Sequence, residues 1–182
     1  MKSRLIVFAV SAVLIIGGLL YAKNDRGIEN LRELSLIDLS SKPKEDREVP
    51  QDAWEYRSLD YKFSLLYPEG MSVKEFDEGG GAKTVIFENT EIVSGFQIFV
   101  VPYGDNKISE ERFRMDVPSK VRTDLKNIEV GGVEATSFYS TNFVLGDTYE
   151  IWLINNGYLY ELTTLKQLEP FLNEVVATWE FI

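Results

Sequence analysis

The stretch NIEVGGVEATSFYSTNFVLGDTYEIWLINNGYLYELTT, residues 127–164, decides the fold. β-branched and aromatic residues alternate with polar ones on both sides of Gly131-Gly132, and again on both sides of Asn155-Asn156-Gly157. Turns of this composition join antiparallel strands, because glycine and asparagine readily adopt the left-handed backbone conformation of tight hairpins. We therefore predict strands over 127–130, 133–141, 148–154 and 158–164, joined as an antiparallel meander.

The residues before this stretch show the same pattern. Residues 53–59 and 62–67 are predicted to be paired strands that turn near Asp60-Tyr61. Residues 72–76 and 84–88 flank a glycine-rich segment, 77–81, which we expect to be a flexible hairpin loop. The continuous apolar run 96–101 is typical of a central strand that is buried on both faces.

Two further segments have the periodicity of helices. Ser109-Glu110-Glu111 supplies a capping hydroxyl and an acidic first turn, and apolar residues follow at four-residue spacing as far as Leu125. Pro118 is expected to kink this helix or to divide it. Apolar residues from Leu168 to Trp179 mark one face of a final helix, and residues 179–182 either extend it or form a short strand. The order of elements predicts an α+β domain over 53–182.

Residues 1–22 have the composition of a membrane anchor. Residues 5–22 are 18 consecutive uncharged and mostly apolar residues, enough helix to cross the hydrocarbon core of a bilayer. A cleaved secretory signal is the alternative, but its apolar region is usually shorter and ends in small residues, whereas this one ends in Leu20-Tyr21-Ala22. We predict an uncleaved transmembrane signal-anchor in the bacterial cytoplasmic membrane, with the C-terminal domain outside the cytoplasm.

Residues 23–52 are predicted to link the anchor to the domain. Ile28, Leu31, Leu34 and Leu39 recur at helical intervals, so we expect a short juxtamembrane helix. Its apolar stripe would rest on the bilayer, pair with another protein or pack on the chain's own domain. Residues 40–52 contain two prolines, seven charged residues and a single aliphatic residue, a composition that cannot form a core.

The composition excludes several classes of function. With 19 Lys and Arg against 29 Asp and Glu, the formal net charge of −10 opposes nucleic-acid binding, which depends on basic residues. The chain has no histidine and no cysteine, so it cannot build a zinc finger, a thiol nucleophile or a Ser-His-Asp triad. We predict no catalytic residue, no cofactor and no metal site.

Two segments resemble ligand-binding motifs but have simpler structural explanations. Residues 78–84, EGGGAKT, suggest a phosphate-binding loop, but Ala82 interrupts the required Gly-Lys-Thr, and a hairpin explains the glycines. Oxygen-bearing side chains that could hold a hard cation gather before the first helix, yet their spacing does not match a calcium loop, and a capped helix start explains them: Asp105, Asn106, Glu110 and Glu111.

Four acidic residues, Glu134, Asp147, Glu150 and Glu161, lie in or beside neighbouring predicted strands. A pair of them that faces a cleft could act as general acid and base. Solvent-facing strand positions explain them more simply, because carboxylates are rarely buried.

The aromatic residues give the candidate interaction surface. Most of them must lie in the core, because they supply much of the area that the domain buries. Alternation nevertheless places Trp54 and Tyr56 on one face of their strand, and Tyr158 and Tyr160 on one face of theirs. If one such face is uncovered, it would bind a protein or a ligand.

Three features of the domain together suggest a family. They are residues 61–70, YKFSLLYPEG, with an aromatic-x-Phe strand that ends in Tyr-Pro; residues 128–135, IEVGGVEA, with a glycine hairpin; and residues 177–181, ATWEF, after the closing helix. In these features the chain resembles the PsbP-like family, whose fold is shared with a nuclear Ran-binding factor and with many bacterial envelope proteins.

The resemblance implies an α/β/α sandwich around a central, largely antiparallel sheet, acting as a binding or assembly module and not as an enzyme. Some photosynthetic members bind metal ions partly through histidines, which this chain lacks. Neither a photosystem role nor Ran binding is therefore carried over.

We accordingly expect a divergent, membrane-anchored bacterial member of this family: a non-catalytic interaction or assembly module of the cell envelope, whose partner is another envelope protein. One alternative is an envelope receptor for a small ligand or a cation. The other is a hydrolase that uses paired carboxylates.

Overall fold

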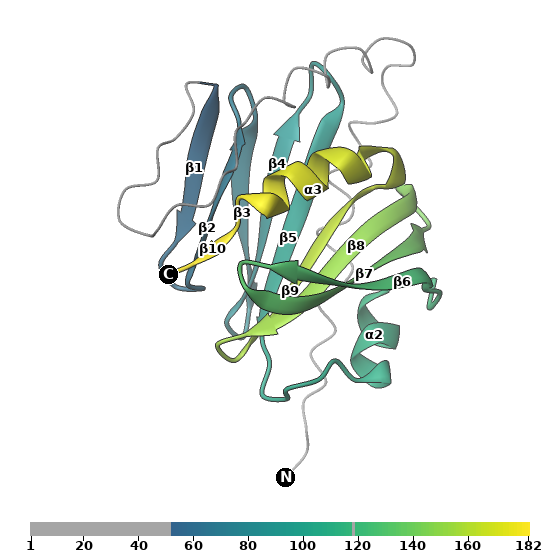
Figure 1. Ribbon diagram of the computed structural model, residues 1–182. Coiled ribbons are helices and arrows are strands. Elements are labelled where there is room, and N and C mark those ends of the chain that lie inside the picture. The colour runs from purple at the N-terminus through teal and green to yellow at the C-terminus, as the bar shows by residue number, and fades with distance from the viewer. Residues whose placement is uncertain (1–51, 118) are drawn as a thin grey trace.

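The computed structural model describes residues 52–117 and 119–182 (Figure 1). The predicted signal-anchor and juxtamembrane helix lie outside these residues. No helix in the described part of the chain combines the length and the hydropathy that crossing a bilayer requires.

Seven strands form the larger sheet, and every neighbouring pair in it is antiparallel. In spatial order they are β3 (Ser72–Gly79), β4 (Ala82–Asn89), β5 (Ser94–Pro102), β9 (Tyr158–Leu165), β8 (Gly146–Asn155), β7 (Val133–Asn142) and β6 (Thr123–Val130). The sheet thus consists of two meanders, β3-β4-β5 and β6-β7-β8-β9, which meet where β5 pairs with β9. The predicted antiparallel meander and the central position of β5 are confirmed.

The predicted hairpins are also confirmed. Gly131 and Gly132 have φ angles of 57° and 80°, and Asn156 and Gly157 have 51° and 80°, the positive values that two-residue hairpins of this type require. The hairpin between β3 and β4 is tighter than predicted, because β3 continues to Gly79. Most of the expected loop over 77–81 is therefore strand.

A second, three-stranded sheet contains β1 (Ala53–Ser58), β2 (Phe63–Pro68) and β10 (Glu180–Phe181), in the order β1-β2-β10. The pairing of β1 with β2 is as predicted. The central antiparallel sheet is the seven-stranded one, and the separation of these strands into a second sheet was not predicted. Pro68-Glu69-Gly70 ends β2, and Gly70, with φ of 84°, turns the chain into the larger sheet.

Two α-helices complete the domain. Ser109 caps α2 (Glu110–Asp116), since its side-chain oxygen accepts a hydrogen bond from the Arg112 N–H at 3.0 Å. The predicted continuation to Leu125 is wrong: the helix ends before Pro118, because proline disfavours helical conformation in the residue that precedes it, and Leu125 belongs to β6. A 3₁₀ turn, η2 (Lys166–Leu168), leads into α3 (Glu169–Ala177), and β10 is the short final strand that the sequence left open.

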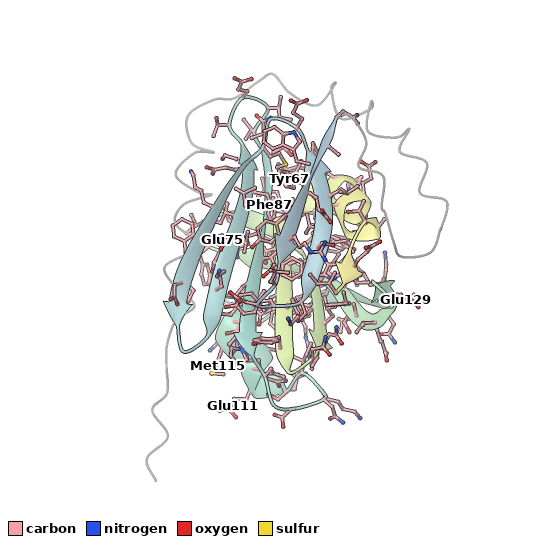
Figure 2. The ribbon with its side chains drawn as sticks, turned by 90° about the vertical axis from the view of Figure 1, so that its left-hand side faces the viewer. Tyr67, Glu75, Phe87, Glu111, Met115 and Glu129 are labelled. Carbon is pink, nitrogen blue, oxygen red and sulfur yellow. The ribbon has the colours of Figure 1, made fainter. Side chains whose placement is uncertain are left out.

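The two helices cover opposite faces of the larger sheet (Figure 1). α3 and the three-stranded sheet lie on one face, here called the α3 face, where Tyr67 of β2 packs against Phe87 of β4 with ring centroids 5.2 Å apart (Figure 2). The other, the α2 face, receives Phe113 of α2 and Val117, the residue that follows the helix. The result is an α+β domain of antiparallel sheets whose main core lies beneath α3 and the smaller sheet.

Candidate interaction surface

Two hairpin turns place apolar side chains at one end of the larger sheet. In the β7–β8 turn, the Asn142 side-chain oxygen accepts hydrogen bonds from the N–H groups of Val144 at 2.8 Å and Leu145 at 3.1 Å. This local arrangement fixes the turn. Phe143 is left 83% exposed and Val144 51% exposed, so two large apolar side chains project into solvent.

The β4–β5 turn is built in the same way. The side-chain oxygen of Asn89 accepts hydrogen bonds from the N–H groups of Glu91 at 3.0 Å and Ile92 at 3.3 Å. Val93 has a φ angle of 52°, which is strained for a β-branched residue. Ile92 and Val93 are half-buried. We call Ile92, Val93, Phe143, Val144 and Leu145 the tip surface.

A groove lies between the two turns. It is open to solvent and spans about 550 Å³ when that open solvent is counted, and both Val93 and Leu145 contribute to its walls. Phe87 and Leu165 of the sheet and Leu168 of η2 add to its apolar wall. The other lining residues are polar or glycine: Glu88, Asn89, Thr90, Ser94, Gly95, Thr163 and Thr164. An apolar groove beside exposed apolar turns is typical of a surface that binds a partner.

Two side-chain oxygens of groove-lining residues, Glu88 Oε2 and Ser94 Oγ, lack a hydrogen-bond partner among the described residues. Ser94 lines the groove and is 7% exposed, and its hydroxyl oxygen makes no hydrogen bond with any described residue. Burying a hydroxyl without a partner costs free energy. A bound group that hydrogen-bonds to Ser94 while its apolar part contacts Leu168 would therefore fit the groove.

The aromatic residues singled out in the sequence lie elsewhere and differ in exposure. Trp54 is 49% exposed and contacts the edge of the Tyr67 ring. Tyr56 is half-buried and donates a hydrogen bond to Glu75 at 3.0 Å; burial and this carboxylate raise the pKa of Tyr56. Tyr158 is half-buried against Tyr61.

Tyr160 shares the α3 face with Tyr158, as alternation indicated, with ring centroids 6.4 Å apart. It is fully buried, however, and its hydroxyl donates to the backbone oxygen of Tyr61 at 2.6 Å. Tyr160 therefore has no side-chain surface with which to meet a partner. Trp54 is the most exposed of the four.

The structure brings together two of the four acidic residues considered as an acid–base pair. Glu150 and Glu161 lie on adjacent strands, both on the α2 face and both buried. Glu150 accepts hydrogen bonds from Thr148 at 2.7 Å and from Thr163 at 2.6 Å, and burial raises its pKa. Glu134 and Asp147 remain exposed, and Asp147 accepts a hydrogen bond from Thr141.

The Glu161 side chain contacts a basic side chain of α2. The Arg112 guanidinium lies 3.5 Å from a Glu161 carboxylate oxygen and also forms an ion pair with Asp116, four residues along the helix. Burial and the neighbouring Asp116 raise the pKa of Glu161 well above its usual value. Because these side chains contact one another, they hold α2 on the sheet, which is a structural role.

The two motif-like segments fit their structural explanations. Gly79, Gly80 and Gly81 all have positive φ angles in the β3–β4 hairpin, and Lys83 pairs with Glu75 at 2.7 Å. Ser109 caps α2, and Glu110 pairs with Arg122. Within the described ranges, no three Asp and Glu side chains are grouped so that they could hold a metal ion.

No family model and no curated protein matches the sequence. The solution structure of cyanobacterial PsbP (CyanoP) from Synechocystis sp. PCC 6803 is similar, with a TM-score of 0.53 and 13% identity, over 77% of this chain and 98% of that chain. The domain has a PsbP-like fold. A crystal structure from Bacteroides thetaiotaomicron is similar over 72% of this chain and 49% of that chain, with a TM-score of 0.49 and 19% identity.

The tip surface was not identified from the sequence. A signal was present, since Phe143-Val144-Leu145 is a run of three apolar residues between Asn142 and Gly146, in a segment that separates two predicted strands. Apolar residues in such a turn have no core to enter, because loops run over the surface. The groove depends on the approach of two turns distant in sequence, which no local pattern indicates.

Proposed function

We propose that this protein is a membrane-anchored, non-catalytic interaction module of the cell envelope, in which the PsbP-like domain binds another envelope protein through the tip surface. The observation that carries the proposal is the 83% exposure of Phe143 beside an apolar groove. Large aromatic side chains are enriched at protein interfaces, and binding would remove this one from water.

The first strand of the domain begins near the tip surface, and this supports a partner near the membrane. Ala53 pairs with Pro68, and Gly70, two residues further on, lies beside Asn89 of the β4–β5 turn. The tether from the proposed anchor, residues 1–22, therefore enters the domain close to the tip surface. We infer that this surface faces proteins held in or near the same membrane.

A protein partner is favoured over an anionic lipid surface. The chain carries a formal net charge of −10, and Glu91 and Asp147 are exposed in or next to the two turns. Anionic headgroups repel carboxylates, whereas a protein can offer basic groups around an apolar contact.

The test is site-specific photo-crosslinking of the full-length protein in cells. A photoreactive residue replaces Val144, which is 51% exposed; the matched control replaces Leu125, 53% exposed, on β6. We expect one crosslinked protein from position 144 that position 125 does not capture, and its loss when Phe143→Ser is added. Equal capture from both positions, or capture that survives Phe143→Ser, would contradict the proposal.

The groove supports a second candidate, a small apolar ligand with one hydrogen-bonding group. The unpartnered Ser94 hydroxyl favours it. Such a ligand would raise the melting temperature of the parent protein and raise it less in Ser94→Ala, which a thermal-shift screen of amphipathic small molecules measures. No difference between parent and variant across the screen would exclude this candidate.

A further inference from the structure

The described helices cover one half of the α2 face. α2 packs on Phe138, Trp152 and Leu159, which belong to β7, β8 and β9. Toward the other meander, the Arg112 guanidinium reaches the ring of Phe99 on β5 and lies 5.9 Å from the ring centroid. Figure 2 places α2, marked by Glu111 and Met115, at the lower end of the domain.

The other half of this face is buried all the same. Ile86 and Thr84 of β4 are 0% exposed, and Gln97 of β5, the cross-strand partner of Ile86, is 9% exposed. Thr84 also pairs across the strands with Phe99, which places all these side chains on the α2 face. Side chains on an open sheet face contact water, so their burial requires a cover.

The cover has to include polar groups as well as apolar ones. The Gln97 side-chain oxygen is buried and makes no hydrogen bond to any residue in 52–117 or 119–182. Buried side-chain oxygens are nearly always hydrogen-bonded. An acceptor left unpaired beside the buried Ile86 indicates that the layer over these strands comes from outside the described residues.

We propose that the juxtamembrane segment, residues 28–39, lies across this half of the α2 face. Its stripe of Ile28, Leu31, Leu34 and Leu39 would cover Ile86 and Phe99, and polar residues between them offer donors to Gln97. This occupant is part of the same chain, so its local concentration is high.

The length of the tether permits this placement. Residues 40–52 are 13 residues that join the segment to β1, and they reach roughly 43 Å when extended. β1 belongs to the small sheet on the α3 face, so the tether has to pass around the β3 edge of the larger sheet. The spacing between stacked sheets, about 10 Å, plus four strand spacings of about 4.8 Å gives roughly 29 Å, which is within the reach of the tether. The five residues 23–27 would then separate the anchor from a docked segment, so the domain would be held against the membrane and would not swing on a long linker.

The test uses the natural absence of cysteine. In full-length protein in detergent, Leu34→Cys is combined with Lys74→Cys or, as control, with Glu75→Cys. Lys74 and Glu75 are adjacent on β3 and their side chains are 46% and 45% exposed. Lys74 pairs with Ile86 and so lies on the α2 face, whereas Glu75 accepts a hydrogen bond from Tyr56 on the opposite face.

We expect a short bismaleimide to link 34 to 74 within one chain roughly tenfold faster than 34 to 75, seen as a mobility shift on denaturing gels. Equal rates would overturn the proposal. A crosslinked dimer in place of the intramolecular product would identify a second copy as the cover and also overturn it.

A second measurement does not depend on how two cysteines are positioned for crosslinking. Leu31→Asp with Leu34→Asp in the full-length protein should speed amide hydrogen exchange in β4 and β5, while Glu29→Gln with Glu33→Gln, on the other side of the predicted helix, should not. Unchanged exchange in the aspartate variant would show that another protein or the bilayer, and not this segment, covers the face.

Discussion

Replacing Gly131 by alanine tests how the β6–β7 hairpin meets the C-terminus. A β-carbon at Gly131 would lie 2.9 Å from Cδ1 of Trp179 and 3.1 Å from Cδ2 of Phe181, so these rings would have to move. Gly132, the next residue in the same turn, is the matched control, because a β-carbon there meets no atom within 4 Å. Both glycines have positive φ angles, 57° and 80°.

The magnitudes follow from these two contributions. Alanine in the left-handed region costs about 1–2 kcal/mol, so Gly132→Ala should lower the free energy of unfolding by that amount. Gly131→Ala adds an overpacking cost of about 1–3 kcal/mol, because the nearest ring is stacked on Phe63 with centroids 4.3 Å apart and cannot move freely. The expected loss is therefore about 2–5 kcal/mol.

The assay is urea denaturation of the domain, residues 53–182, followed by circular dichroism, with tryptophan fluorescence as a second probe of Trp179. Gly131→Ala should also change the native-state fluorescence, and Gly132→Ala should not. If both variants lose the same free energy of unfolding, Gly131 does not pack closely against Trp179. That result would refute the close packing between the β6–β7 hairpin and the C-terminal residues.

Three further changes test the buried acids, the β7–β8 turn and the core. Because the folded-state pKa of Glu161 is raised well above 4.5, its contribution to stability is present at pH 4.5 and is lost as the pH rises through the folded-state pKa. Glu161→Gln should therefore gain stability relative to the parent as the pH rises from about 4.5, and a difference that does not change with pH would contradict this. Asn142→Ala removes the side-chain oxygen that accepts two hydrogen bonds in the turn and should cost about 1–2 kcal/mol by urea denaturation. Phe143→Ser, at an exposed site, should change the free energy of unfolding by no more than about 0.5 kcal/mol. Leu172→Ala empties a fully buried position on α3 and should cost about 2–5 kcal/mol; a smaller loss would mean that α3 is loosely packed.

The sequence predicted the elements whose signals are local. Gly131-Gly132 and Asn156-Gly157 lie at two-residue turns because they supply positive φ angles, and Ser109 caps its helix because its hydroxyl satisfies an amide of the first turn. The overshoot to Leu125 has a physical cause too. The four-residue spacing of apolar residues continued through Pro118, but a proline removes a helical hydrogen bond and apolar spacing cannot replace it.

Features that depend on distant residues were not predicted. The division into two sheets arises because β10, at the C-terminus, pairs with β2 near the start of the domain. Strand alternation correctly grouped Tyr158 with Tyr160, yet it could not tell which face would be covered, and Tyr160 proved to be fully buried. The burial of Glu150 and Glu161 likewise depends on the position of α2 above them.

The junction of the two meanders has a consequence for the kinetics of folding. Five of the six pairings in the larger sheet join strands that are neighbours in sequence. The sixth joins β5 to β9 across the centre of the sheet, where the Thr164 hydroxyl donates to the Gly95 oxygen from 69 residues away. Closing so long a loop costs entropy before any contact compensates for it. Each meander can form early from local hairpins, so the joining of β5 to β9 is expected to limit the folding rate. Until β5 and β9 pair with each other, each of them has an unpaired edge that can pair with a strand of another chain. Formation of this central pair removes both edges and so ends that risk of aggregation.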